Sequence, residues 1–156
     1  MRKINKKVSD EETIEYLKKG QIIHLALTDG NTPYCVPMSY GYKDGAIYMH
    51  CAHEGRKIDM IKKNPLTAFT VVADSELIKK ETSCGWTIHF ESVMGEGRIE
   101  IVSGADEKRA GLNALMEHYG RFENSYPDEI LGRTCVLKLT IDSCVGKKSP
   151  APSKGA

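Results

Sequence analysis

One long alternating stretch restricts the possible folds of this chain more than any other feature. Residues 86–102 alternate between apolar and polar side chains, and Gly95 and Gly97 interrupt the alternation. A period of two is typical of a β-strand with one buried face. Glycine inside a strand usually marks a bulge or a sharp bend, and such bends allow a sheet to close on itself. The stretch therefore predicts a long, bent strand in a closed β-barrel.

Shorter apolar segments separated by turn residues predict further strands. The turns contain Asp29-Gly-Asn31 and Lys43-Asp-Gly45, which tolerate positive φ, and the second is typical of a hairpin. Both turns join consecutive antiparallel strands. We expect strands at residues 22–27, 34–42, 46–50, 66–73, 86–102 and 134–141, and a loop at residues 74–84.

Helical spacing appears at three places between these strands. Ser9 followed by Glu12 is a capping-box pattern, and it predicts a helix near residues 10–19. Further helices are expected at residues 56–63 and from residues 103–107 onward. Hairpins with few helices predict a mainly β (α+β) fold, a barrel of antiparallel strands with a few flanking helices. We expect one domain over residues 1–148, a loose chain from Lys147, and a flexible tail at residues 149–156.

Composition excludes several classes of function. Lys and Arg number 22 against 21 Asp and Glu, a net charge of +1, and a nucleic-acid-binding protein is usually clearly basic. None of the apolar runs approaches the length of about 20 residues that crosses a bilayer. The five cysteines include no Cys-x-x-Cys pair, which favours a reduced, cytoplasmic protein. The balanced charge and the short apolar runs lead us to expect neither nucleic acid nor membrane as a partner. No Gly-x-Gly-x-x-Gly sequence follows a strand and no Walker loop is present, so the two commonest nucleotide-binding signatures are absent.

The segment from His50 to Lys57 is the most unusual part of the sequence. A strand ends at His50 and a helix begins near Gly55, where Arg56 and Lys57 add positive charge. Free N–H groups at a helix N-terminus attract anions, and both Arg and Lys suit phosphate. The segment therefore predicts a phosphate site, although a solvated basic helix start that binds nothing fits the same pattern.

Residues near this segment suggest two other kinds of site. His50, Cys51 and His53 are zinc-type ligands, but the remaining histidines are scattered and no second ligand cluster follows, so we expect no metal. Pro37 interrupts an otherwise good strand, and proline cannot donate to a sheet ladder. That strand should be an edge strand, which either faces solvent or offers its free polar groups to a planar heteroaromatic ring.

Several segments together resemble a known family. They are Pro33-Tyr-Cys-Val-Pro-Met-Ser-Tyr40, Ala46-Ile-Tyr-Met-His50, Gly55-Arg-Lys57, Asn64-Pro65, Glu91-Ser-Val-Met-Gly-Glu-Gly97 and Gly146-Lys147. In this order and spacing they resemble the pyridoxamine 5′-phosphate oxidase-like FMN-binding superfamily, nearest its 5-nitroimidazole antibiotic-resistance (Nim-type) branch. The resemblance covers residues 8–148. It implies a split β-barrel homodimer with FMN at the subunit interface.

The resemblance also implies roles for individual residues. Pro37, Met38, Ser39 and Tyr40 would border the flavin ring, and His50, Cys51 and Ala52 would line the ring and ribityl chain. Gly55, Arg56 and Lys57 would hold the phosphate. Ser92 would come from the neighbouring subunit, and Lys147 would reach the same site.

The activity implied is reduction of small molecules. The strand with Cys35-Val-Pro-Met-Ser-Tyr40 lacks the Arg and Lys of the vitamin-forming oxidases, which argues against oxidation of pyridoxamine phosphate. The nearer branch implies NAD(P)H-dependent reduction of nitroimidazole or nitroaromatic compounds, with His50 as proton donor or as a residue that only packs on the cofactor. A non-catalytic flavin-binding or sensing protein, and a heme-binding relative of the same fold, are the alternatives.

Overall fold

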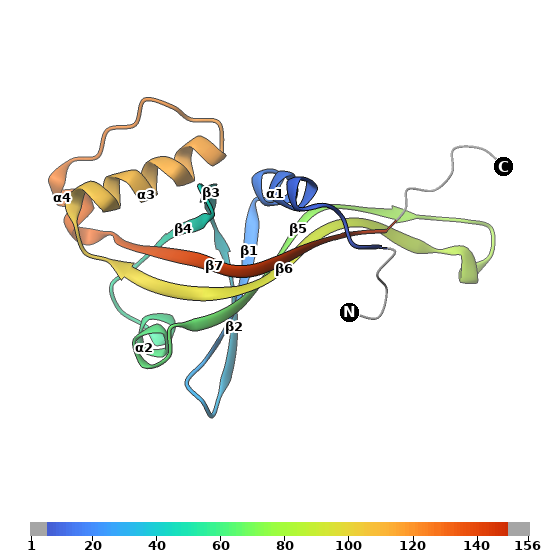
Figure 1. The fold of residues 1–156 in the computed structure, drawn as a ribbon, viewed down its shortest axis with the longest axis horizontal. Coiled ribbons are helices and arrows are strands. Elements are labelled where there is room, and N and C mark those ends of the chain that lie inside the picture. The colour runs from blue at the N-terminus through green and yellow to red at the C-terminus, as the bar shows by residue number, and fades with distance from the viewer. Residues whose placement is uncertain (1–5, 150–156) are drawn as a thin grey trace.

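The computed structural model describes residues 6–149, and these form one antiparallel sheet with helices around it (Figure 1). The strand order is β2-β1-β5-β6-β7-β4-β3. The strands are β1 Ile22–Thr28, β2 Pro33–Ser39, β3 Gly41–Lys43, β4 Ala46–Cys51, β5 Leu66–Ile78, β6 Thr87–Val102 and β7 Cys135–Lys148; the helices are α1 Asp10–Lys19, α2 Arg56–Lys63, α3 Ala105–His118 and α4 Asp128–Arg133, with a short 3₁₀ turn at Ser83–Gly85.

The sheet must close because of how β2 and β3 are connected. These strands lie at opposite ends of the strand order, yet only Tyr40 separates them in the chain. The two edges therefore have to meet, and β2 contacts β4 across the barrel. The prediction of one strand over residues 34–42 is therefore wrong, because this segment forms two strands, β2 and β3, with Tyr40 between them. Tyr40 is fully buried and its hydroxyl donates a hydrogen bond of 2.5 Å to the Leu17 carbonyl, so the residue between β2 and β3 is anchored in the core.

The predicted bend in the long strand is confirmed. The pairing of β6 with β7 shifts register between Glu96 and Gly97, which is a bulge. A Cβ atom on Gly95 would lie 2.5 Å from the ring of Phe69, a core residue that is 2% exposed. Gly95 therefore leaves room for a core side chain, and Gly97 leaves room for the Thr140 carbonyl of β7.

Two strands are longer than the sequence predicts. β5 continues through residues 74–78, which were expected in a loop, and β7 continues to Lys148, which was expected in a loose segment. Beyond the barrel, β5 and β6 form a projecting two-stranded arm (Figure 1). Ser149 is buried and bonded to the backbone of Phe90, while residues 150–156 of the expected tail lie outside the described residues.

The helices α1, α2 and α3 begin close to where the sequence predicts, whereas α4 was not predicted. Together they cover only part of the barrel. The Ser9 side chain accepts a hydrogen bond from the Glu12 N–H and caps α1. α1 contacts β5, β6 and β7, and α3 contacts β3, β4 and β7. In Figure 1 both helices lie on the upper side of the sheet, and α2 lies on the opposite side. The outer face of β1, β5 and β6 is thus left uncovered by helices.

Candidate functional site

The start of α2 presents backbone N–H groups that no side chain caps. Gly55 occupies the N-cap position with φ of 116°, a conformation that favours glycine. Its carbonyl accepts the first helical hydrogen bond, from Asp59 at 3.1 Å. The N–H groups of Arg56, Lys57 and Ile58 have no partner further back along the helix, so they are available to an anion.

Arg56 connects this helix start to the edge strand β2. Its guanidinium lies 4.7 Å from the centre of the Tyr34 ring, a cation–π arrangement. The stacking holds the planar face of the guanidinium and leaves its rim of N–H donors for a ligand. Sequence reasoning did not identify Tyr34, which alternates onto the opposite face of β2 from Pro37 and packs against the core.

Lys57 lies close enough to Cys51 to affect its ionisation. Burial raises the pKa of the Cys51 thiol to about 11, although the positive charge of Lys57 lowers it. Cys51 also pairs in register with Cys135, which is 1% exposed, and this neighbouring thiol raises the pKa of Cys51 further. Cys51 is therefore a half-buried neutral thiol at neutral pH rather than a nucleophile.

The predicted flavin-ring residues on β2 divide between two faces. Pro37 and Ser39 are exposed on the outer face, whereas Met38 and Tyr40 point into the core with 8% and 0% of their surface exposed. Pro37 lies on an edge strand as predicted, because β2 pairs only with β1. A ligand at β2 can meet the Pro37 and Ser39 side chains, while the ring of Tyr40 offers it no surface in this chain.

His50 is exposed at the end of β4, and its Cα pairs with that of Val136. The imidazoles that form hydrogen bonds within residues 6–149 are those of His53, His89 and His118, and His50 is not among them. Ala52 and Gly55 are also exposed in the loop that follows. The segment from His50 to Lys57 is therefore an accessible corner between β4 and α2.

Ser92 and Lys147 lie apart from that corner. They are paired Cα partners on β6 and β7, and the Ser92 hydroxyl is 3.4 Å from the Lys147 carbonyl. Three strand spacings separate β6 from β2, about 14 Å along the sheet. The predicted site residues thus form two separate groups in one chain, and their roles stay predictions.

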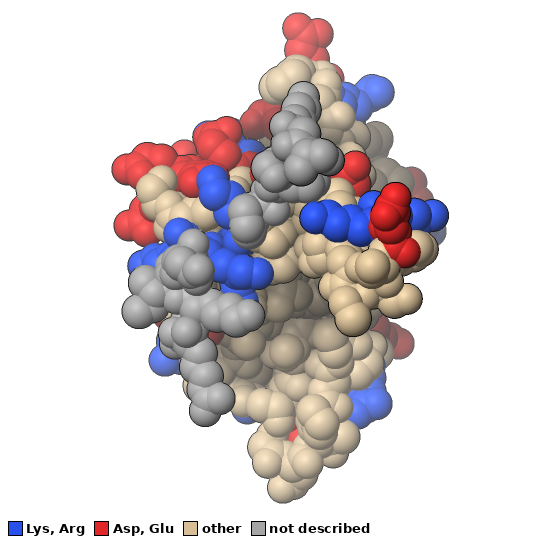
Figure 2. All heavy atoms as spheres, turned by 90° about the vertical axis from the view of Figure 1, so that its right-hand side faces the viewer, with Lys and Arg blue, Asp and Glu red and all other residues tan. Residues whose placement is uncertain are grey.

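The uncovered outer face of the sheet lies between the two groups. In register, Pro37, His24, Thr70 and Met94 form one row across β2, β1, β5 and β6. Exposed large apolar side chains follow the same face from the barrel to the arm: Ile22, Leu66, Val72, Leu77, Ile88 and Met94. Figure 2 looks at the end of the molecule from which the arm projects, and the surface below the arm is mostly free of charged side chains.

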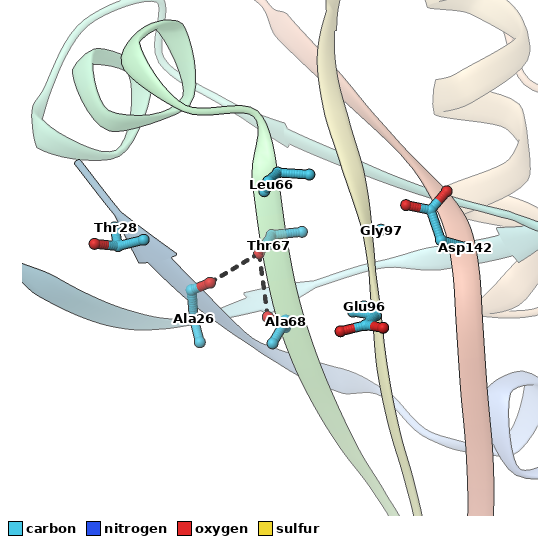
Figure 3. Close-up of a pocket in the computed structure, with 8 residues that line it drawn as sticks. All are labelled: Ala26, Thr28, Leu66, Thr67, Ala68, Glu96, Gly97 and Asp142. Atoms are coloured by element: carbon cyan, nitrogen blue, oxygen red, sulfur yellow. Dashed lines mark hydrogen bonds between the residues drawn. The ribbon is translucent and has the colours of Figure 1, made fainter. Parts of the chain in front are cut away.

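A hollow of about 430 Å³ lies at one end of this face (Figure 3). Thr67 stands at its base, with its hydroxyl 3.0 Å from the Ala26 carbonyl. The carboxylates of Glu96 and Asp142 lie on the opposite side from Thr28. Because the lining contains two carboxylates and no cation, it does not suit a phosphate group. The start of α2 remains the better anion site.

The described part of the chain shows neither a metal-binding cluster nor a membrane-spanning helix. Within residues 6–149, no three or more His, Cys, Asp and Glu side chains gather in a way that could hold a metal ion. None of the helices in this region is long and apolar enough to span a membrane.

Comparison with known proteins identifies the family of this chain. The family model for pyridoxamine 5′-phosphate oxidase matches residues 9–148. The chain belongs to the pyridoxamine 5′-phosphate oxidase family. The barrel is accordingly the split β-barrel of that family, as the sequence resemblance implied. No curated protein matches the chain.

Solved structures of this family's fold match most of the chain. A protein assigned to 5-nitroimidazole antibiotic resistance, from Bacteroides thetaiotaomicron, is 28% identical with a TM-score of 0.81, covering 91% of this chain and 86% of that one. Flavocytochrome Anf3 of Azotobacter vinelandii is 20% identical with a TM-score of 0.80 over 97% and 73% of the two chains. The FAD and heme binding protein of Mycobacterium smegmatis is 21% identical with a TM-score of 0.80 over 97% and 77%.

Proposed function

We propose that this protein is a homodimeric FMN-binding reductase that uses NAD(P)H to reduce small acceptors such as nitroimidazole and nitroaromatic compounds. The observation that carries the proposal is the uncapped start of α2, where Gly55, Arg56 and Lys57 adjoin the edge strand β2. One ligand can place its phosphate at the start of α2 and its ring along β2 only if these two elements are neighbours.

The residues at the helix start fit a phosphate group. No atom lies within 4 Å of the position that a Cβ on Gly55 would take, so the backbone is open to a ligand on that side. Arg56 supplies donors in a planar fork and Lys57 a point charge, and both act beside the positive end of the helix dipole. Three independent features therefore favour an anion at one place.

Related proteins support a flavin as the ligand. Solved structures with the same fold include proteins that bind FAD, and the Bacteroides thetaiotaomicron protein, at 28% identity, is assigned to nitroimidazole resistance. A bound flavin would supply the redox chemistry. The chain itself would hold the phosphate, exclude water from the ring and place His50 as a proton donor or as a packing residue.

A second copy of the chain would complete the site. Ser92 and Lys147 lie about 14 Å or more along the sheet from β2 in the same chain, so we expect them to serve a flavin at β2 from a partner. The apolar face of Ile22, Val72 and Met94 between the groups is exposed in the single chain. Contiguous apolar surface of this kind marks interaction sites in soluble proteins.

We expect the Lys57→Ala substitution to weaken FMN binding by about 10- to 150-fold, because a charge-assisted hydrogen bond contributes roughly 1.5–3 kcal/mol. Fluorescence titration with FMN measures the effect. Lys62→Ala is the matched control, since Lys62 is exposed near the other end of the same helix. Equal FMN affinity in the two variants would overturn the phosphate assignment.

The cofactor and the activity are tested separately. Absorbance spectra after titration with FMN, FAD and heme distinguish the ligands, because heme alone gives an intense Soret band. Oxidation of NADH or NADPH that depends on 2-methyl-5-nitroimidazole would support the reductase. Tight FMN binding without turnover over a panel of acceptors would identify a flavin-binding or sensing protein instead.

A further inference from the structure

A second hollow lies on the outer face, and none of its lining residues belongs to the proposed phosphate site. It has a volume of about 450 Å³, within the range of small-molecule sites. It lies over β1 and β5, next to the end of α1. Its lining residues are Lys19, Gln21, Ile22, His24, Val72 and Ala73.

His24 is the polar group with free hydrogen-bonding capacity on the β1 wall of this hollow. Its neighbours Ile23 and Leu25 are 0% exposed, so the imidazole projects from the outer face. Among residues 6–149, the hydrogen-bonded imidazoles are those of His53, His89 and His118. An exposed imidazole with no internal partner can both donate and accept a hydrogen bond with a ligand.

The register places His24 beside the proposed flavin strand. Its Cα pairs with that of Pro37 on one side and that of Thr70 on the other. Directly paired side chains on one face lie about 4.5–5.5 Å apart at Cβ. A flavin ring along Pro37 would therefore have His24 as its immediate neighbour.

The lining of the hollow offers no free charge to an anion. Lys19 is the charged residue among those that line it. The Lys19 ammonium lies 2.7 Å from the Asp74 carboxylate and 2.7 Å from the Glu91 carboxylate, which lie outside the lining and offset its charge. The apolar side chains of Ile22 and Val72 therefore favour an uncharged flat ligand.

We propose that this hollow is the acceptor subsite, and that it binds a small, uncharged, planar heteroaromatic molecule whose polar edge hydrogen-bonds to the His24 imidazole. The assignment rests on the proposed function, because the strand with Pro37 is where the flavin is expected. In a dimer formed through the outer face, the second copy closes the hollow from above and shields the ligand from water.

Nicotinamide and nicotinate form a matched pair of probes, since they share a shape and differ in charge. With FMN-saturated full-length protein at pH 7.5, chemical shifts of the histidine ring C–H groups report binding. We expect nicotinamide to shift the His24 signals and to bind at least tenfold more tightly than nicotinate. His24→Ala and Val72→Trp, which fills the hollow, should each weaken nicotinamide binding at least tenfold, and His89→Ala should not.

FMN affinity separates this inference from the proposed function. If FMN binds normally but His24→Ala and Val72→Trp leave nicotinamide affinity unchanged, the subsite is wrong and the flavin proposal stands. If FMN does not bind, the same titrations without it still test the hollow. Nicotinate binding as tightly as nicotinamide, or nicotinamide leaving the His24 signals unmoved because the second copy fills the hollow, would also overturn the subsite.

Discussion

At the scale of single residues, Cys51 shows how burial decides chemistry at the edge of the proposed site. The thiol lies between Lys57, which favours the thiolate, and the buried Cys135, which favours the thiol. Burial dominates, and it raises the pKa to about 11. Proximity to a lysine is therefore not enough to make this cysteine reactive.

We predict that Cys51 reacts slowly with iodoacetamide at pH 7.5. A pKa of about 11 in place of 9.0 means about a hundredfold less thiolate. Mass spectrometry of timed samples measures labelling, with the exposed Cys84 as the internal reference. Labelling of Cys51 as fast as that of Cys84 in the folded protein would contradict the burial effect.

The raised pKa of Cys51 also predicts how the free energy of unfolding depends on pH. Since the folded pKa is raised, the unfolded chain ionises first as the pH rises from about 9 to about 11. The free energy of unfolding should therefore fall across this window, and it should fall less in Cys51→Ala. Urea denaturation at pH 8 and at pH 10.5 measures the difference, and parallel losses in both proteins would refute it.

At the scale of elements, the β6–β7 pair depends on glycine at one position. A Cβ on Gly97 would collide with the Thr140 carbonyl, a backbone atom that has no side-chain freedom to move away. The bulge beside Gly97 changes the register between β6 and β7, because Asp142 of β7 has no Cα partner there. Glycine at position 97 therefore allows the β7 backbone to approach β6 closely at this bulge.

We expect Gly97→Ala to lower the free energy of unfolding by about 1–3 kcal/mol, the usual cost of overpacking. Gly132→Ala is the control, because nothing lies within 4 Å of its Cβ position in α4. That change should be neutral or stabilising by up to about 1 kcal/mol. Chemical denaturation followed by circular dichroism compares the two, and an unaffected Gly97→Ala protein would exclude the close contact.

At the scale of the whole molecule, the apolar residues outside the core are not scattered evenly. Leu66 and Val72 on β5, Met94 on β6 and Ile88 on the arm are between 38% and 53% exposed and share one face. The helices cover other faces of the barrel. The uncovered face is therefore the surface on which a second copy would dock.

We predict that Met94→Glu disrupts a dimer and, with it, FMN binding. A carboxylate at the centre of the apolar face would be desolvated without a partner. Light scattering gives the molar mass, and FMN titration reads the shared site. Phe122→Glu is the matched control, since Phe122 is 67% exposed but lies outside this face. A Met94→Glu dimer that keeps its FMN affinity would rule out this interface.

Much of the local structure could be predicted from the sequence. The Ser9 cap, the edge position of Pro37, the bend at Gly97 and the start of α2 each follow from a local rule of backbone chemistry, and the structure confirms them. Family resemblance supplied the split barrel, which no local rule distinguishes from other barrels.

Strand lengths could not be predicted in the same way. Residues 74–78 of β5 and residues 142–148 of β7 are largely polar, so they have no alternating apolar signal. They are strands because long partners on β6 satisfy their backbone hydrogen bonds. His24 and Tyr34 were missed for a related reason, since their importance depends on which strands lie beside theirs.

The sequence alone determined which residues face inward, where the chain turns, and where an anion could bind, because these depend on neighbours a few positions away. Only the tertiary structure decided that the predicted strand breaks at Tyr40 and that Ser92 and Lys147 lie apart from Pro37. It also brought His24 beside Pro37 over a hollow. Strand order and register depend on contacts between distant segments, and the packing of the whole chain selects them.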